Sequence, residues 1–232
     1  MTSELFDAVL FDAGGVLVLP DPTVLAPLLA PYGGDPAIAS HCRAHYAAMA
    51  VKSSARAGAA FWSEYDRAYV ESVHVDPAHR DHAAQLLNIT RTAQLWRWPI
   101  PDSMSALRAL AHDRVPMGVV SNASGQIEQE LLRSEICQVG EGIGVAMRCV
   151  IDSHVVGVAK PDPQIFEHAL AFFSEFDRAQ IAYVGDSVTM DVGGATAAGL
   201  RPILLDPYDD HPDAEFERIR SLHDLIPRFS RR

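Results

Sequence analysis

Short, almost uninterrupted apolar runs recur along this sequence, and segments with helical periodicity separate them. Such runs are typical of parallel strands that are covered on both faces, because neither face then needs polar residues. Regular alternation with helices implies right-handed crossovers and a Rossmann-like, doubly wound α/β sheet. We expect strands at 8–11, 117–120, 149–151, 181–184 and 203–205, and helices at 103–112, 126–136, 164–173 and 192–198.

The segment from residue 20 to residue 98 breaks this alternation, since it contains no convincing strand pattern. Three stretches in it are compatible with helices, namely 38–51, 58–73 and 77–91. Prolines mark both of its edges: Pro20, Pro22, Pro99 and Pro101. We expect an α-helical domain over 20–98, inserted through two stiff linkers into a core domain made of 1–19 and 99–232.

The net charge limits the classes of partner, and the cysteines indicate the cellular compartment. The formal net charge is −11, whereas nucleic acids and anionic membranes both require a basic surface. Neither is therefore expected as a partner. Cys42, Cys137 and Cys149 are odd in number and form no CxxC pair, which suits a reducing cytoplasm better than a disulfide framework. We expect a cytoplasmic globular protein, whose oligomeric state the sequence does not define.

The first apolar run ends in Phe11-Asp12-Ala13-Gly14-Gly15, a carboxylate followed by two glycines. Ligands of open parallel sheets bind beyond the carboxyl ends of the strands. Glycines let backbone amides approach an anion closely. An ordinary loop aspartate gives the same local pattern, so this motif indicates a ligand site only if the other strands also end in suitable polar residues.

Polar residues also follow the other predicted strands. Ser121 and Asn122 offer a hydroxyl and a backbone amide, the donors that a phosphate oxygen requires, although Ser-Asn is also a common turn. Asp186 and Asp191 follow a later strand, although Asp191 could instead cap the next helix. If these carboxylates converge with Asp12 in a cleft, their repulsion favours a hard cation such as Mg²⁺.

Lysine is scarce in this chain, where Lys52 and Lys160 are the two lysines among 19 basic residues. Lys160 precedes Pro161, which restricts it to extended backbone and suits the start of a helix. A compact ammonium there could neutralise a phosphoryl oxygen and restrain the Asp12 carboxylate. A solvated lysine is the alternative.

This ordered set of short motifs resembles the haloacid dehalogenase-like hydrolase superfamily over the whole chain. The residues that carry the resemblance are Asp12, Ser121, Lys160, Asp186 and Asp191. The helical segment at 20–98 matches the cap that the family inserts between its first and second motifs. The resemblance implies a phosphohydrolase that acts on a small phosphorylated metabolite through an aspartyl phosphate on Asp12.

The resemblance also implies a complete active site. Mg²⁺ would be bound by Asp12, the backbone carbonyl of Gly14, Asp186 and Asp191. The phosphate would be held by Ser121, Asn122 and Lys160, of which Ser121 and Lys160 would share in catalysis with Asp12.

Gly14 departs from the family pattern. Phosphatases of the family usually carry a second aspartate at this position, which protonates the leaving oxygen and then activates water. Glycine retains the carbonyl but lacks the side chain, and general acid–base catalysis contributes about 10²- to 10⁴-fold in rate. Three explanations are compatible with this glycine. A cap residue or the substrate could supply the proton, or the substrate could have a good leaving group. Alternatively, the chain is not an efficient phosphatase.

Other functions share these motifs. Phosphonoacetaldehyde hydrolases also have a small residue at this position and use a cap lysine as a Schiff base, for which Lys52 is the candidate. A surface or substrate-binding role is the other interpretation of Lys52. A non-catalytic phospho-ligand sensor would tolerate Gly14. Haloacid dehalogenases need no metal and would not require Asp186 and Asp191 together.

Several conspicuous residues are assigned to packing or solvent. His41 and His45 lie four residues apart without a third ligand nearby, which favours packing or solvent exposure over a metal pair. The tryptophans are expected to pack the cap against the core rather than to stack on substrate: Trp62, Trp96 and Trp98. The acidic run at 206–213 is expected to be a solvated loop.

Overall fold

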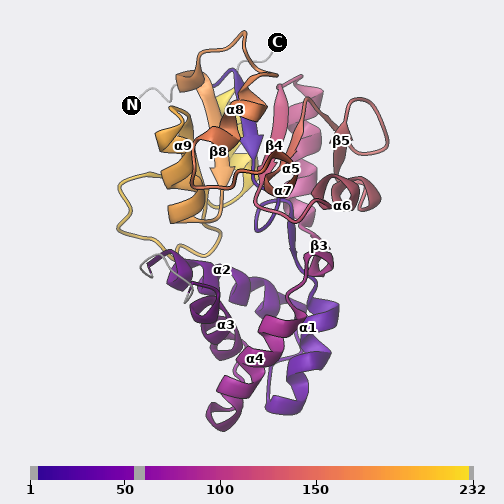
Figure 1. Ribbon diagram of the computed structural model, residues 1–232, viewed down its shortest axis with the longest axis vertical. Helices are drawn as coiled ribbons and strands as arrows, with labels where there is room; N and C mark the ends of the chain where they lie inside the picture. The colour runs from indigo at the N-terminus through magenta and orange to yellow at the C-terminus, as the bar shows by residue number, and fades with distance from the viewer. Residues whose placement is uncertain (1–4, 55–60, 230–232) are drawn as a thin grey trace.

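A six-stranded sheet forms the centre of the computed structural model, which describes residues 5–54 and 61–229 (Figure 1). The strands lie in the order β10-β9-β8-β1-β4-β7, and every neighbouring pair is parallel. Their bounds are β1 Ala8–Phe11, β4 Met117–Ser121, β7 Val150–Asp152, β8 Ile181–Gly185, β9 Arg201–Leu205 and β10 Glu217–Ile219. The chain builds one side of the sheet outward from β1 and then returns to build the other. A ligand crevice is therefore expected at the carboxyl end of β1.

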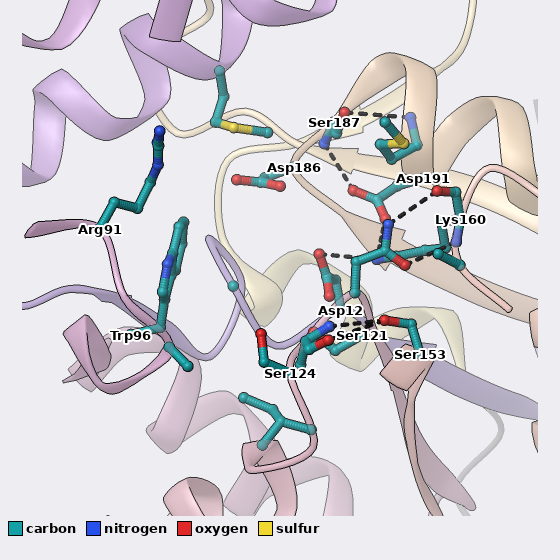
Figure 2. Close-up of a pocket in the computed structure, with 18 of the residues that line it drawn as sticks. Asp12, Arg91, Trp96, Ser121, Ser124, Ser153, Lys160, Asp186, Ser187 and Asp191 are labelled. Atoms are coloured by element: carbon teal, nitrogen blue, oxygen red, sulfur yellow. Dashed lines mark hydrogen bonds and ion pairs between the residues drawn. The ribbon is translucent and has the colours of Figure 1, made fainter. Parts of the chain in front are cut away.

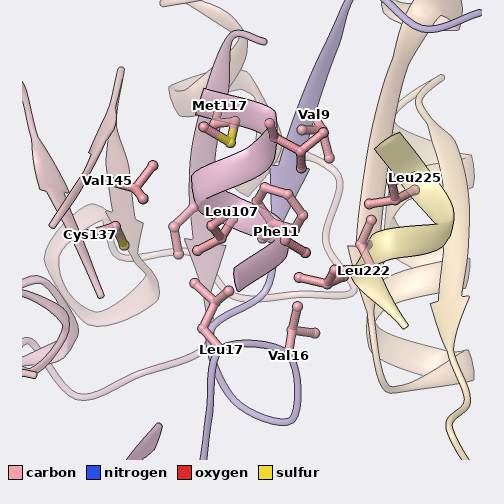
Figure 3. Packing of buried hydrophobic residues seen from close by; sticks show 14 of the residues in the cluster. Val9, Phe11, Val16, Leu17, Leu107, Met117, Cys137, Val145, Leu222 and Leu225 are labelled. Carbon is pink, nitrogen blue, oxygen red and sulfur yellow. The ribbon is translucent and has the colours of Figure 1, made fainter. Parts of the chain in front are cut away.

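Both faces of the sheet are covered by helices. Val9 and Phe11 of β1 belong to one apolar cluster (Figure 3), whereas Ala8 and Leu10 belong to a second one, as the two-residue period of a strand requires. The first cluster includes residues of α5 (Pro101–His112) and η6 (Leu222–Arg228), and the second includes residues of α8 (Gln164–Leu170) and α9 (Gly193–Ala197). The predicted doubly wound α/β fold is confirmed.

The predicted strands and crossover helices are present with small shifts at their ends, and α6 (Ile127–Arg133) is among them. Several short elements escaped prediction: α7 (Ser153–Val156), η4 (Arg178–Gln180), and the parallel pair of β5 (Cys137–Val139) and β6 (Val145–Met147). The expectation of a solvated acidic loop is wrong for Asp206, which is buried. Its carboxylate accepts hydrogen bonds from the backbone amides of Asp210 and His211 and from the Arg218 guanidinium.

In the sequence, a group of α-helices lies between β1 and the other strands of the six-stranded sheet. In space, these helices occupy the lower part of Figure 1. These inserted helices are α1 (Pro22–Leu29), α2 (Ile38–Ser54), α3 (Phe61–Ser72) and α4 (Arg80–Thr90), with short turns η1 (Ala30–Tyr32), η2 (Pro77–His79) and η3 (Ala93–Leu95). They enclose an apolar cluster of their own. Across the described ranges, no helix has the length and apolarity that a bilayer span requires. The division into core and cap at residues 20 and 98 stays a prediction.

The expectation that the segment 20–98 contains no strand is wrong at its edges. β2 (Val18–Pro20) and β3 (Trp96–Pro99) pair antiparallel, with Leu19 opposite Trp98. The two linkers therefore form a hydrogen-bonded ribbon that connects the inserted helices to the sheet. This ribbon fixes the position of Trp96 above the loop that follows β1.

Candidate active site

The adjacent strands β4, β1 and β8 end at one edge of the sheet, where a cavity of about 490 Å³ opens (Figure 2). Asp12 directly follows β1, Ser121 is the last residue of β4, and Asp186 directly follows β8. All three line the cavity, together with Gly14, Asn122, Lys160 and Asp191. The residues that the sequence singled out for chemistry are thus brought to one place.

Lys160 links the acidic side chains of this cavity. Its Nζ atom lies 3.0 Å from Asp12 Oδ2 and 2.6 Å from Asp191 Oδ1, and it donates a hydrogen bond to the Tyr183 hydroxyl at 2.8 Å. Burial alone would lower the pKa of Lys160, but the carboxylates of Asp12 and Asp191 outweigh it, so that the pKa is raised. Lys160 is therefore held as an ammonium against Asp12.

Asp12 experiences opposing influences. Burial raises its pKa, the nearby Lys160 ammonium lowers it, and the carboxylates of Asp191 and Asp186 raise it again, with the result that its pKa is about 7. One ammonium is not enough to compensate for three converging carboxylates. The site consequently favours the arrival of another positive charge.

The three carboxylates offer a set of oxygen ligands. One ligand atom each from Asp12, Asp186 and Asp191 lies within 4.8 Å of the others. Carboxylate oxygens are the ligands that Mg²⁺ prefers, so this donor set fits the ion. Asp191 also has bonds to the protein, since Oδ1 contacts Lys160 and Oδ2 accepts from the backbone N–H of Ser187. Asp191 therefore contacts the lysine that also faces Asp12.

Asn122 has a bond pattern that the sequence did not predict. Its side-chain amide donates to the carbonyl of Lys160 at 2.9 Å, and its Oδ1 accepts from the Lys160 N–H at 2.8 Å. The side chain thus holds the lysine backbone in place. Ser121 is buried and lines the cavity. Its role in phosphate binding stays a prediction, as does that of the Asn122 backbone amide.

His45 of α2 is a residue whose importance the sequence did not indicate. It was assigned to packing or solvent, as His41 was, but its Nε2 lies 2.8 Å from Asp186 Oδ2. His41 does pack among the inserted helices, where it contacts the Tyr69 hydroxyl. The spacing of the two histidines placed both on one helix face, but only the fold shows that His45 meets a carboxylate of the core.

The inserted helices and the ribbon that connects them to the sheet contribute one wall of the cavity, which includes Met49, Lys52, Trp62, Arg91 and Trp96. The Lys52 ammonium lies 3.8 Å from the centroid of the Trp62 ring, and the Arg91 guanidinium lies 4.3 Å from it. The surface interpretation of Lys52 is wrong, since its side chain is buried, and burial lowers its pKa. Trp62 and Trp96 likewise line the cavity. Trp96 also packs against the apolar clusters of both the core and the inserted helices, as expected from the sequence.

Comparisons with known proteins agree with this geometry. A family model described as haloacid dehalogenase-like hydrolase matches residues 6–199. The chain is 26% identical to the pyrimidine 5'-nucleotidase YjjG of Escherichia coli over 177 residues, which cover 71% of this chain and 75% of that protein. It is 32% identical to a phosphoserine phosphatase of Thermus thermophilus over 111 residues, which cover 47% of this chain and 42% of that protein.

A solved structure extends the likeness to the whole fold. A crystal structure of a dehalogenase with an intermediate complex superimposes with a TM-score of 0.61, at 18% sequence identity, and the match covers 99% of both chains. At that identity the likeness concerns the fold alone.

Proposed function

Because the chain belongs to the haloacid dehalogenase-like hydrolase family, we propose that it is a phosphohydrolase in which Asp12 takes up the phosphoryl group of a small phosphorylated substrate. The observation that best supports this proposal is the contact between the Asp12 carboxylate and the Lys160 ammonium, 3.0 Å apart, in the cavity. That contact keeps the nucleophile oriented beside a positive charge that a phosphoryl oxygen can approach.

In the proposed reaction, a carboxylate oxygen of Asp12 attacks phosphorus in line with the leaving oxygen. The new P–O bond forms as the old one breaks, and the leaving oxygen takes up a proton. Water then attacks the aspartyl phosphate and loses a proton, which releases phosphate and restores the carboxylate. Ser121, the backbone amide of Asn122 and Lys160 are the proposed donors to the phosphoryl oxygens.

Mg²⁺ is the proposed cofactor, held by Asp12, the Gly14 carbonyl and Asp186, with Asp191 in support. The cluster of three carboxylates is the observation that supports it. When bound, the ion would offset the negative charge of the phosphoryl group. The residues of the chain then have to orient Asp12, hold the phosphate oxygens and exclude water other than the attacking molecule.

We propose that residues 20–98 act as a cap and that the substrate enters between the cap and the core. Residues of both parts line the same cavity, and closure of such a lid typically excludes solvent. By their names, two relatives act on a pyrimidine 5'-nucleotide and on phosphoserine. A small phosphorylated metabolite is what these substrates share, and that is the class proposed here.

The proposed setting is the cytoplasm, without nucleic acid or membrane as partner. The net charge of −11 supports the absence of both partners. Cys137 and Cys149 are buried free thiols, as is usual in a reducing compartment.

A second candidate function is cleavage of a carbon–phosphorus bond, and the position of Lys52 favours it. The Lys52 amine lies in the cavity that contains Asp12, and its lowered pKa favours the neutral, nucleophilic form. The amine would condense with the aldehyde of a phosphonoaldehyde and release water. Transfer of the phosphoryl group to Asp12 would then leave the electron pair of the C–P bond in an enamine. Membership of a family of hydrolases argues against the alternative of a non-catalytic phospho-ligand sensor.

The test is a screen of phosphorylated metabolites with the wild type, Asp12→Asn and the control Asp81→Asn, whose side chain is exposed on α4. We expect hydrolysis by the wild type and the control in Mg²⁺, and none by either protein in EDTA. Asp12→Asn should lose at least about 10³-fold in turnover. Hydrolysis that persists in EDTA would contradict the metal dependence.

For the second candidate, borohydride should trap phosphonoacetaldehyde on Lys52 of the wild type, and the same treatment of Lys52→Arg should trap nothing.

A further inference from the structure

His45 connects the inserted helices directly to the acidic cluster. The imidazole is buried, and its Nε2 lies 2.8 Å from Asp186 Oδ2. The two residues are 141 positions apart in the sequence, so the contact exists only when α2 lies against the end of β8. Gly15 lies beside this contact, and a β-carbon there would be 2.8 Å from His45 Nε2. The chain therefore leaves room for this bond at the loop that carries the nucleophile.

The partners of the two ring nitrogens define the direction of the hydrogen bonds. A carboxylate only accepts, so Nε2 donates to Asp186. Nδ1 lies 3.0 Å from the Tyr65 hydroxyl. Burial raises the pKa of Tyr65 well above its usual value, so that this hydroxyl retains its proton and remains a hydrogen-bond partner of Nδ1. A chain of two bonds thus runs from α3 through α2 to Asp186.

We propose that His45 is a positioning residue for the metal site: its bond to one oxygen of Asp186 fixes that carboxylate for the cation, so that the site is complete only while α2 lies against the core. This proposal rests on the proposed metal-dependent function. Ligating carboxylates are commonly oriented by such hydrogen bonds, and loss of one typically costs 10- to 100-fold in metal affinity.

Other bonds support the same placement of α2. The Tyr46 hydroxyl donates to the carbonyl of Gly15 at 2.8 Å, and the backbone N–H of Val188 donates to Ser53 Oγ at 3.2 Å. Both bonds join α2 to segments that flank Asp12 and Asp186. Metal binding and closure of the inserted helices should therefore favour each other to the same extent, as linkage between two equilibria requires.

His41 provides a matched control, because it lies one turn earlier on α2, is equally buried and also contacts a tyrosine hydroxyl. Mn²⁺ is the probe, and its free concentration is measured by electron paramagnetic resonance. We expect the Kd for Mn²⁺ to rise about 10- to 100-fold in His45→Ala and to stay unchanged in His41→Ala. His45→Gln keeps an N–H donor and should fall between the wild type and His45→Ala.

Hydrogen exchange of the α2 amides is the second readout. Mn²⁺ should slow it in the wild type and have much less effect in His45→Ala. An unchanged Kd in His45→Ala would overturn the proposal, and a lower Kd would show that His45 blocks the ion instead of preparing its ligand. If the wild type itself binds no Mn²⁺, the proposed metal dependence fails first.

Discussion

The ring of Trp96 lies over Gly14, with its Cζ3 atom 3.1 Å from the place that a β-carbon on Gly14 would occupy. This is the position where phosphatases of the family usually carry their second aspartate. The missing acid/base is therefore accompanied by an aromatic ring that fills its space, and Trp96 comes from the ribbon between the core and the inserted helices. The glycine and the tryptophan form one structural unit.

We predict that Gly14→Asp alone does not raise turnover. The new side chain has to displace the ring, and such overpacking typically lowers the free energy of unfolding by about 1–3 kcal/mol. Gly14→Asp combined with Trp96→Leu should relieve the overlap and raise turnover at least about 10-fold over Gly14→Asp, since general acid catalysis contributes about 10²- to 10⁴-fold. The gain should be larger for an alkyl phosphate than for p-nitrophenyl phosphate, whose leaving group needs no proton.

Trp96→Leu is the control for the effect of the smaller side chain by itself. Steady-state kcat on both substrates checks the prediction. A rise in kcat of Gly14→Asp on the alkyl phosphate, with Trp96 intact, would show that the ring does not restrict this position.

Gly15 should be far less tolerant of a side chain than Gly14. Its φ of 72° lies in the left-handed region, which costs residues with a β-carbon roughly 1–2 kcal/mol. A β-carbon there would also overlap Asp186 Oδ2. We expect Gly15→Ala to lower the free energy of unfolding by more than about 2 kcal/mol, whereas Gly14→Ala should cost less. Urea unfolding of the two variants decides this, and equal losses would contradict it.

Removal of Lys160 should make the free energy of unfolding depend on whether a divalent ion is present. In Lys160→Met, Asp12 and Asp191 lose the ammonium between them, and breaking a buried ion pair typically costs about 3–5 kcal/mol. Mg²⁺ should recover part of that loss, because it restores positive charge to the cluster. The measurement is the urea midpoint in EDTA and in Mg²⁺. The control is Arg178→Met, which breaks an exposed pair with Glu167 and should cost at most about 1 kcal/mol.

The core of the site could be predicted because parallel strands end at the same edge of a sheet. Asp12, Ser121 and Asp186 each follow or end an apolar run, so that a correct strand assignment was enough to bring them together. Lys160 was identified by the scarcity of lysine and by Pro161. None of these inferences required knowledge of how the inserted helices lie.

The contributions of the inserted helices could not be predicted, because they depend on long-range packing. The helical spacing of His41 and His45 indicates a shared face but not what that face meets, and the contact of His45 joins residues 141 positions apart. β3 escaped prediction because its four residues, Trp96–Pro99, are too few for a clear alternation and end in proline. Asp206 was misassigned because a run of acidic residues gives no sign of which one is buried by backbone amides and an arginine.

The two lysines should differ in their reactivity toward small acylating reagents. An amine reacts only when neutral, and burial lowers the pKa of Lys52. The pKa of Lys160 is raised, since Asp12 and Asp191 outweigh its burial. Lys52 should therefore become reactive at a lower pH than Lys160. Acetylation by acetic anhydride over a pH series, followed by peptide mass spectrometry, measures both profiles in one sample.

Unfolded protein in urea supplies the control for this comparison, because there both lysines should titrate near the ordinary value of about 10.4. In the folded protein, the Lys52 profile should lie below that reference and the Lys160 profile above it. A Lys52 profile at or above the reference would remove the physical basis for a Schiff base in this cavity. If the Lys52 profile lies at lower pH than the reference and borohydride traps the substrate, carbon–phosphorus cleavage is favoured. If the profile lies at lower pH but nothing is trapped, the role left for Lys52 is that of a cation that binds an anionic part of a phosphate ester.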